Sequence, residues 1–260
     1  MEKSLSYRAV LGTPSLLGLI AALVLSTTES HACGVSGPEG ASLCAIAEGA
    51  GPKWRLSFAG STTWTRIHWS NDLNVDQTRG AGLVFLGYAA SPRLLFQGGL
   101  GASYGGSTRM PDGPHSFNPG GLATFGVSYR IYGGPTASEK GEAVDRNPFI
   151  VLSAQLSMNA TTTQVGLDAS TNTRYLAFDL RLGAAVGVTL FERFRPYALA
   201  RIFGGPIFWS YRGESLTGTD LYKYQFGGGA SVSIANGVSV FAEGVFLGET
   251  GASGGLGFAF

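Results

Sequence analysis

Two histidines near carboxylates could do acid–base chemistry in this sequence. His68 is followed by Asp72 and Asp76, and His115 lies three positions after Asp112. A histidine oriented by a carboxylate can act as a general base, but catalysis also needs a nucleophile or an activated water beside it. Neither cluster matches a catalytic motif, so we predict no catalytic residues. We interpret both clusters as solvated loop residues and keep an enzyme as the alternative.

Oxygen-bearing side chains gather in one short segment and could bind calcium weakly: Asn71, Asp72, Asn74 and Asp76. No glycine stands where a calcium-binding loop needs its sharp turn. The sequence also has no zinc-ligand spacing, no phosphate-binding glycine loop and no serine elbow. We therefore predict no metal and no cofactor.

A third set of charged residues lies inside predicted strands, on their more polar face: Arg130, Asp179, Arg181, Arg201, Lys223 and Glu243. If the strands close into a narrow barrel, this face lines the lumen. Buried charges need partners, so the simpler interpretation is that these side chains pair and fill the lumen. The alternative is a constriction along a path for ions or solutes.

The strands are predicted from alternation with a period of two. In 94–104, large apolar residues alternate with Gln97, Gly99, Gly101 and Ser103. The polar faces carry serine, glutamine, glycine and single charges, whereas a solvent-exposed face would be rich in lysine and glutamate. This inside-out pattern is typical of a transmembrane barrel. We place ten strands, at 53–68, 78–89, 94–105, 120–132, 149–162, 173–190, 194–210, 221–234, 238–247 and 253–260.

The connections alternate between tight turns and longer polar loops, as expected for periplasmic turns and outer loops. The long, charged connection 133–148 breaks this rule and is either a periplasmic flap or a sign that the strands are miscounted. Aromatic residues fall at both predicted rims and would form two interfacial girdles. The periplasmic girdle would contain Trp54, Tyr88, Tyr129, Tyr132, Tyr197 and Phe260, and the outer girdle Trp69, Tyr104, Tyr175, Trp209, Tyr211 and Tyr222.

The first 32 residues are predicted to be a signal peptide, with a basic start, an apolar run of about ten residues and small residues before Cys33. Such a run is shorter than the ~20 residues that a membrane-spanning helix needs. Cys33 and Cys44 are the two cysteines of the sequence. In an exported chain they are expected to form a disulfide within a periplasmic leader, residues 33–52. A lipid-modified Cys33 is the alternative, although Ser30 is not the apolar residue that a lipoprotein signal usually has there.

The overall charge balance gives little indication of a partner. The formal net charge is +1 and charged residues make up 13% of the chain, about half of the usual share. This composition has no basic patch of the kind that binds nucleic acid. Few charges and many glycines and aromatics suit a chain with one face in lipid.

The last residues carry the resemblance to a known family. Leu256, Phe258 and Phe260 are spaced by two and share one face of a predicted strand. This pattern resembles the closing strand of bacterial outer-membrane β-barrels, small barrels of the OmpA-like or omptin-sized class. The resemblance implies that the barrel-assembly machinery recognises these three residues and that the last strand pairs with 53–68.

We therefore expect an all-β fold, a transmembrane antiparallel up-and-down barrel of about ten strands (eight to twelve) over residues 53–260, in the outer membrane. The expected role is structural or surface interaction, or a narrow pore. The alternatives are an outer-membrane hydrolase or acyltransferase with an outer-rim site, and a soluble periplasmic lipid-binding barrel. The expected partners are outer-membrane lipid and the assembly machinery, without nucleic acid, and the protein is expected to be a monomer.

Overall fold

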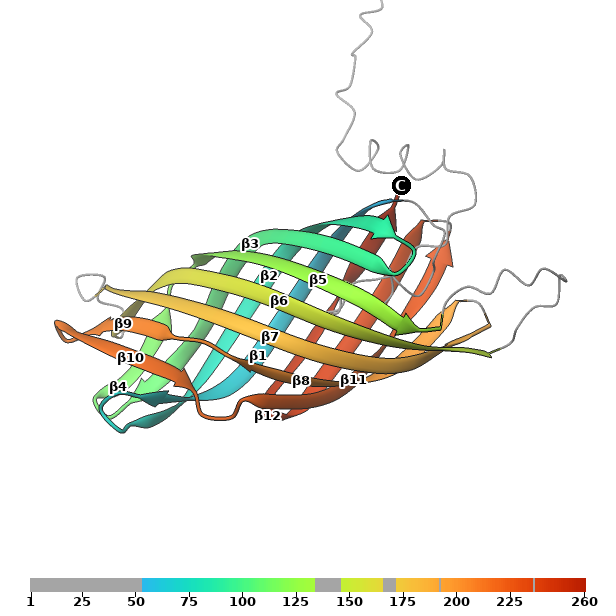
Figure 1. Ribbon diagram of the computed structural model, residues 1–260. Helices are drawn as coiled ribbons and strands as arrows, with labels where there is room; N and C mark the ends of the chain where they lie inside the picture. The colour runs from blue at the N-terminus through green and yellow to red at the C-terminus, as the bar shows by residue number, and fades with distance from the viewer. Residues whose placement is uncertain (1–52, 134–145, 166–171, 192, 236) are drawn as a thin grey trace, which may run out of the picture.

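The computed structural model describes residues 53–133, 146–165, 172–191, 193–235 and 237–260, and this part of the chain is all-β (Figure 1). No helix in these ranges has the length and apolar character needed to cross a membrane. The strands are β1 (Trp54–Trp69), β2 (Asn74–Ser91), β3 (Leu94–Met110), β4 (Gly113–Phe117), β5 (Gly120–Tyr132), β6 (Arg146–Val165), β7 (Thr173–Leu190), β8 (Phe194–Gly204), β9 (Ile207–Tyr211), β10 (Glu214–Asp220), β11 (Tyr224–Ala235) and β12 (Val238–Ala259).

The strands close into a ring. β12 reverses direction at Gly248, whose φ of 77° suits a glycine turn. Its first arm pairs with β11 over Val238–Gly248, and its second arm pairs with β1 over Thr250–Ala259. The Ala259 amide donates to the Gly237 carbonyl at 2.9 Å, so the two arms lie side by side. With β12 counted as two arms, ten antiparallel strands make the ring, as the sequence predicted: β1, β2, β3, β5, β6, β7, β8, β11 and the two arms of β12.

The ring continues at one end into a narrower extension, which we call the collar. There β4 replaces β5 between β3 and β6, and β9 follows β8 along the edge of β7. β10 then pairs with the end of β1, through Ile67–Asp220 and Trp69–Gly218. Eight strands therefore close the collar (β1, β2, β3, β4, β6, β7, β9 and β10), and it lies at the left of Figure 1. We call the opposite end, where the β2–β3 and β7–β8 connections are short, the turn end.

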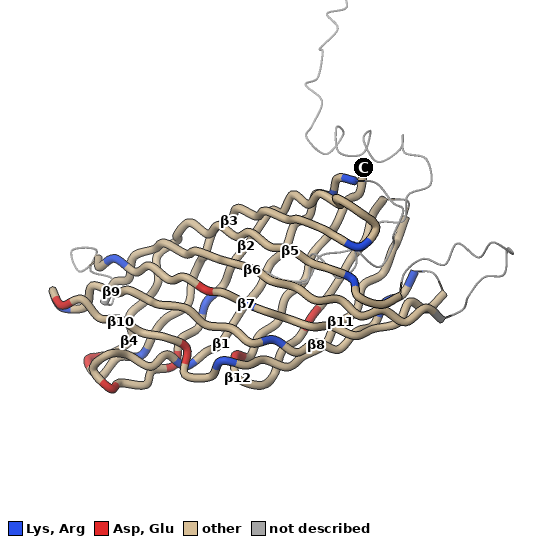
Figure 2. The backbone as a smooth tube through the Cα atoms, viewed as in Figure 1, with Lys and Arg blue, Asp and Glu red and all other residues tan. Residues whose placement is uncertain are grey.

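Side-chain polarity reverses between ring and collar: most Asp and Glu positions lie toward the collar (Figure 2), and β1 shows the change along one strand. In the ring, β1 turns Phe58 and Trp64 outward, both nearly half exposed, and turns small hydroxyl residues such as Ser61 inward. In the collar, the same strand turns Arg66 outward and buries Trp69 completely. An apolar exterior around a polar interior is what a hydrocarbon environment selects, and the opposite is what water selects. The membrane boundary therefore crosses β1 near Thr65.

The lumen contains three packed layers of buried apolar side chains. One lies at the turn end around Leu95, Phe149 and Tyr197. The second lies in the middle of the ring around Phe85 and Phe241. The third fills the collar and is the largest: Ile67, Trp69, Val75, Met110, Phe117, Tyr175, Ile207, Trp209 and Leu216.

Several sequence predictions need correction. The predicted strand 194–210 is divided at Gly205–Pro206 into β8 and β9, because proline cannot donate to a strand ladder. Parts of the predicted loops 106–119 and 211–220 are strands β4 and β10. The outer girdle was wrong for Trp69, Tyr175 and Trp209, which are buried inside the collar, and for Tyr211, which packs against that core. Tyr197 of the periplasmic girdle also points inward. The connection 133–148 falls largely outside the described residues.

Candidate functional site

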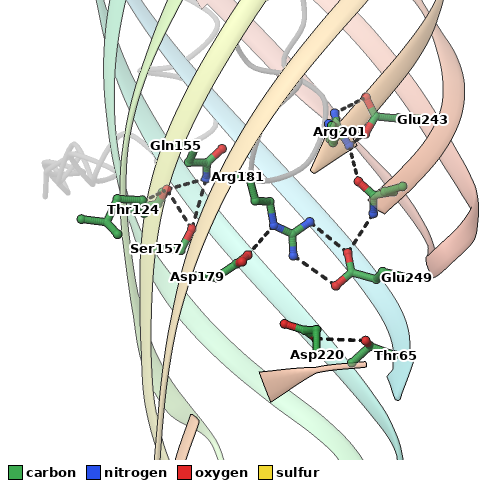
Figure 3. Close-up of polar contacts among 12 residues, drawn as sticks. Thr65, Thr124, Gln155, Ser157, Asp179, Arg181, Arg201, Asp220, Glu243 and Glu249 are labelled. Carbon is green, nitrogen blue, oxygen red and sulfur yellow. Dashed lines mark hydrogen bonds and ion pairs between the residues drawn. The ribbon is translucent and has the colours of Figure 1, made fainter. Parts of the chain in front are cut away.

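A network of hydrogen-bonded polar side chains crosses the lumen between the middle layer and the collar (Figure 3). We call it the lumen network. Arg181 donates to both oxygens of Glu249, at 2.9 and 3.1 Å, and its Nε donates to Asp179. Gln225 donates to Glu249 at 2.9 Å and accepts from Arg201 at 3.1 Å. The lumen network therefore links β7, β8, β11 and both arms of β12.

The lumen network ends at a second two-pronged (bidentate) ion pair. Arg201 donates to the two oxygens of Glu243 at 2.9 and 3.1 Å, and both side chains are about 95% buried. The Tyr197 hydroxyl donates to Glu243 Oε2 at 2.9 Å. Two-pronged arginine–carboxylate pairs fix geometry as well as charge. Because both partners are buried, the pair holds the strands in register, since an unpaired charge there would be costly.

A cavity of about 140 Å³ lies between the lumen network and the collar core. Its floor includes Asp179, Arg181 and Glu249, and its roof includes Tyr175 and Ile207. We call it the chamber. Arg79 of β2 and Asp220 of β10 also line it. Part of its wall is polar and unpaired, since Ser103 Oγ, Asn159 Oδ1 and Asp179 Oδ1 have no hydrogen-bond partner among the described residues.

Five of the six charged residues predicted to line the lumen lie there. Four of them belong to the lumen network: Asp179, Arg181, Arg201 and Glu243. Arg130 is buried at the turn end, where it donates to the Pro92 carbonyl at 2.8 Å. Lys223 is a correction: it is exposed and precedes β11, because that strand begins at Tyr224 and not at 221.

The sequence analysis missed other charged residues of the lumen. Arg55 and Arg195 are buried near the turn end, and Glu249, Arg79 and Asp220 surround the chamber. Glu249 was missed because it lies in the stretch between the ninth and tenth predicted strands. Asp220 was placed in a loop. Arg79 stood in a predicted strand that is apolar on both faces, so its direction could not be read from alternation.

The cluster of His115 and Asp112 lies at the tip of the collar. His115 Nε2 is 3.1 Å from Asp112 Oδ1, and Arg212 donates to the other oxygen of Asp112 from the β9–β10 turn. Burial works to raise the pKa of Asp112, but hydrogen bonds from His115 and Tyr211 hold it below its ordinary value. The imidazole packs edge-on against the rings of Trp209 and Tyr211. These contacts tie the β3–β4 turn to β9, and among the described residues no hydroxyl is hydrogen-bonded to His115.

The second cluster is exposed. His68 Nδ1 is 2.9 Å from Asn74 Oδ1, and Asp76 pairs with Arg66 rather than with the histidine. In the described ranges, no group of three metal-binding side chains is close enough to hold an ion. The signal peptide, the leader and the Cys33–Cys44 disulfide lie outside the described residues. Leu256, Phe258 and Phe260 fall on the second arm of β12 and at its end, beside β1.

Comparisons with known proteins give distant structural similarities. No protein-family model and no curated protein matches the sequence. Among solved structures, the transport unit of the autotransporter AIDA-I from Escherichia coli has a TM-score of 0.44 at 14% identity, over 80% of this chain and 90% of that one. The translocator domain of NalP from Neisseria meningitidis scores 0.43 at 13% identity, covering 80% and 89%. The outer membrane protease OmpT from Escherichia coli scores 0.43 at 8% identity, covering 80% and 97%.

The class of the protein follows from its own geometry. The ten-stranded ring leaves no open sheet edge, its outside is apolar and its inside is polar, which is how a β-sheet crosses a bilayer. The protein is an integral outer-membrane β-barrel.

Proposed function

We propose that the protein is a closed, non-enzymatic outer-membrane barrel that acts through its collar at the cell surface. The aromatic core of the collar carries this proposal. Trp69, Trp209 and Tyr175 are almost completely buried, and their ring centroids are 5.3 to 6.4 Å apart. A lumen packed in this way at the collar, and again in the middle and at the turn end, favours a surface role over a pore.

The collar core is held in place by hydrogen bonds as well as by packing. Trp209 Nε1 donates to the hydroxyls of Thr163 and Thr173 at 2.9 and 3.1 Å. The Tyr175 hydroxyl donates to Gln77 at 2.8 Å. These bonds fix the positions of the Trp209 and Tyr175 rings, whereas Trp69 Nε1 has no hydrogen-bond partner among the described residues and Trp69 is held by packing. These contacts support a fixed closure and not a gate.

The purified barrel, inserted into a planar bilayer, is therefore expected to show no conductance steps. Insertion would be checked on the same sample by its shifted gel mobility without heating. Liposomes that carry the protein should likewise not swell in small sugars. Stepwise conductance of the wild-type protein would contradict the closed barrel and favour the narrow pore.

The proposed orientation places the collar outside the cell. Asn71, in the β1–β2 turn of the collar, and Arg93, at the turn end, are both exposed. In intact cells, a membrane-impermeant maleimide is expected to label an Asn71→Cys variant strongly and an Arg93→Cys variant no more than the wild type. The wild type controls for Cys33 and Cys44. The reverse labelling pattern would show that the collar faces the periplasm.

The same proposal includes the partners expected from the sequence: outer-membrane lipid around the ring, the barrel-assembly machinery at the second arm of β12, and a monomeric state. Two aromatic bands facing lipid support the first of these. Trp54, Tyr88 and Tyr132 are exposed near the turn end, and Tyr104 and Tyr222 are exposed toward the collar. A hydrolase or acyltransferase is the less favoured alternative, because Asp76 pairs with Arg66 and not with His68, and Asp112, the partner of His115, is also engaged by Arg212.

A further inference from the structure

Arg79 is a charged side chain of the lumen whose buried donors lack acceptors. Its guanidinium carbon lies 4.4 Å from the centre of the Phe117 ring and 4.5 Å from that of Tyr175, so the group is held between two rings. Within the part of the chain that the structure describes, its Nε and Nη2 have no hydrogen-bond partner. Two stacked rings fix the guanidinium, but they do not supply the hydrogen bonds that a buried cation normally makes.

Asp220 lines the same chamber, and no cation of the described residues is at salt-bridge distance from it. Its contact is a hydrogen bond of 3.1 Å from the Thr65 hydroxyl to Oδ1. Arg181, the other cation of the chamber wall, is occupied by Glu249 and Asp179 (Figure 3). The chamber therefore presents one cation and one carboxylate, on β2 and β10, that do not pair directly with each other.

The charge balance of the chamber selects among possible ligands. Arg79 and Arg181 face Asp179, Asp220 and Glu249, which gives a formal charge of −1 when Asp220 is ionised; burial and the nearby Glu249 and Asp179 raise the pKa of the Asp220 carboxyl to about 7. A simple anion would add to this excess, and a simple cation would leave Arg79 without a partner. A molecule with both charges would satisfy both groups and leave the total unchanged. Guanidinium groups pair well with carboxylates, so the negative end would lie at Arg79 and an ammonium group at Asp220.

The volume limits the size of such a ligand. About 140 Å³ is close to the volume of an engineered cavity of about 150 Å³ that binds benzene. We infer that the chamber binds a small zwitterion, with its carboxylate on Arg79 and its ammonium group on Asp220. The unpaired oxygens of Asn159 and Asp179 supply further acceptors for the ammonium group. No part of this inference depends on the role of the collar.

The test is retention of radiolabelled probes after refolding. The barrel is refolded in detergent with glycine, β-alanine or 4-aminobutyrate, which differ in the separation of their charges, and free probe is removed by gel filtration. Refolding around the probe makes the entry route irrelevant. At least one zwitterion is expected to remain at nearly one molecule per barrel. Acetate and methylammonium, which carry one charge each, should be retained at less than a tenth of that level.

Variants assign the retention to the two side chains. Arg79→Met and Asp220→Asn are each expected to reduce it at least tenfold. Arg109→Met, which changes an exposed arginine of the same collar wall, should leave it unchanged. If no zwitterion is retained above the level of the single-charge probes, the chamber holds water and the inference is wrong. Equal retention of acetate, or of methylammonium, would overturn it in favour of a simple anion or cation site. The comparison of zwitterionic with single-charge probes uses the wild-type barrel, so it remains decisive even if a variant fails to fold.

Discussion

Deleting Phe258–Phe260 is expected to prevent assembly of the barrel. Ala259 and Phe258 pair with Arg55 and Leu56 of β1, and Phe260 exchanges backbone hydrogen bonds with Trp54 at 3.0 and 3.3 Å. The deletion would leave the start of β1 unpaired on one side and would also remove the bond from Ala259 to Gly237. Each unpaired backbone group in hydrocarbon costs several kcal/mol. The deletion would also remove two residues of the proposed assembly signal, Phe258 and Phe260.

The measurement is the amount of protein in the outer membrane with heat-modifiable gel mobility. The truncated chain is expected at below about a tenth of the wild-type level, with degraded protein in the periplasm. A Phe260→Tyr variant is the matched control, because it keeps an exposed aromatic side chain at the same position and all backbone bonds. It should assemble nearly normally. Wild-type levels of a heat-modifiable truncated barrel would show that these residues do not close the ring.

Replacing Glu243 by Gln is expected to cause the second-largest effect, a loss of about 3–5 kcal/mol in the free energy of unfolding. The substitution keeps the size of the side chain but leaves the charge of Arg201 buried without its carboxylate. It also weakens the hydrogen bond from Tyr197. The free energy would be measured by urea unfolding in lipid vesicles, followed by tryptophan fluorescence.

Two controls separate a buried charge from a general loss of packing. Asp76→Asn breaks the exposed pair with Arg66 on the collar exterior and is expected to change stability little, because solvent screens such pairs. The double variant Arg201→Met with Glu243→Leu removes both charges and should recover most of the loss. If Glu243→Gln lowers the free energy of unfolding no more than Asp76→Asn does, the lumen network does not stabilise the barrel.

The ring could be predicted from the sequence because one physical rule governs it throughout. Alternation placed β5 and β7 at the residues observed, and it assigned Asp179, Arg181 and Glu243 to the inside. The end of the chain was correctly expected beside β1. The rule works there because lipid outside and a packed, polar lumen inside act on every residue of the ring.

The collar could not be predicted because the rule reverses along single strands. Trp69 and Trp209 have the inward direction that alternation gives them, but an aromatic residue at a barrel rim was taken to face lipid. The useful signal was the pair of polar residues Arg66 and His68, which alternate with Ile67 and Trp69. Arg79 and Asp220 come together only because β10 pairs with the end of β1, a contact between distant parts of the chain that local pattern does not contain.

The reversal of polarity along β1 also divides the protein into two thermodynamic parts. Opening the collar would transfer Trp69, Trp209 and Tyr175 into water, which raises the heat capacity as in the unfolding of a soluble domain. The outward residues of the ring, such as Phe58, already contact hydrocarbon and would keep doing so while the chain stays in the bilayer. The heat-capacity increment of this barrel therefore comes from the collar core and the two apolar layers of the lumen, not from its lipid-facing surface, and its stability varies with temperature as that of a smaller protein would.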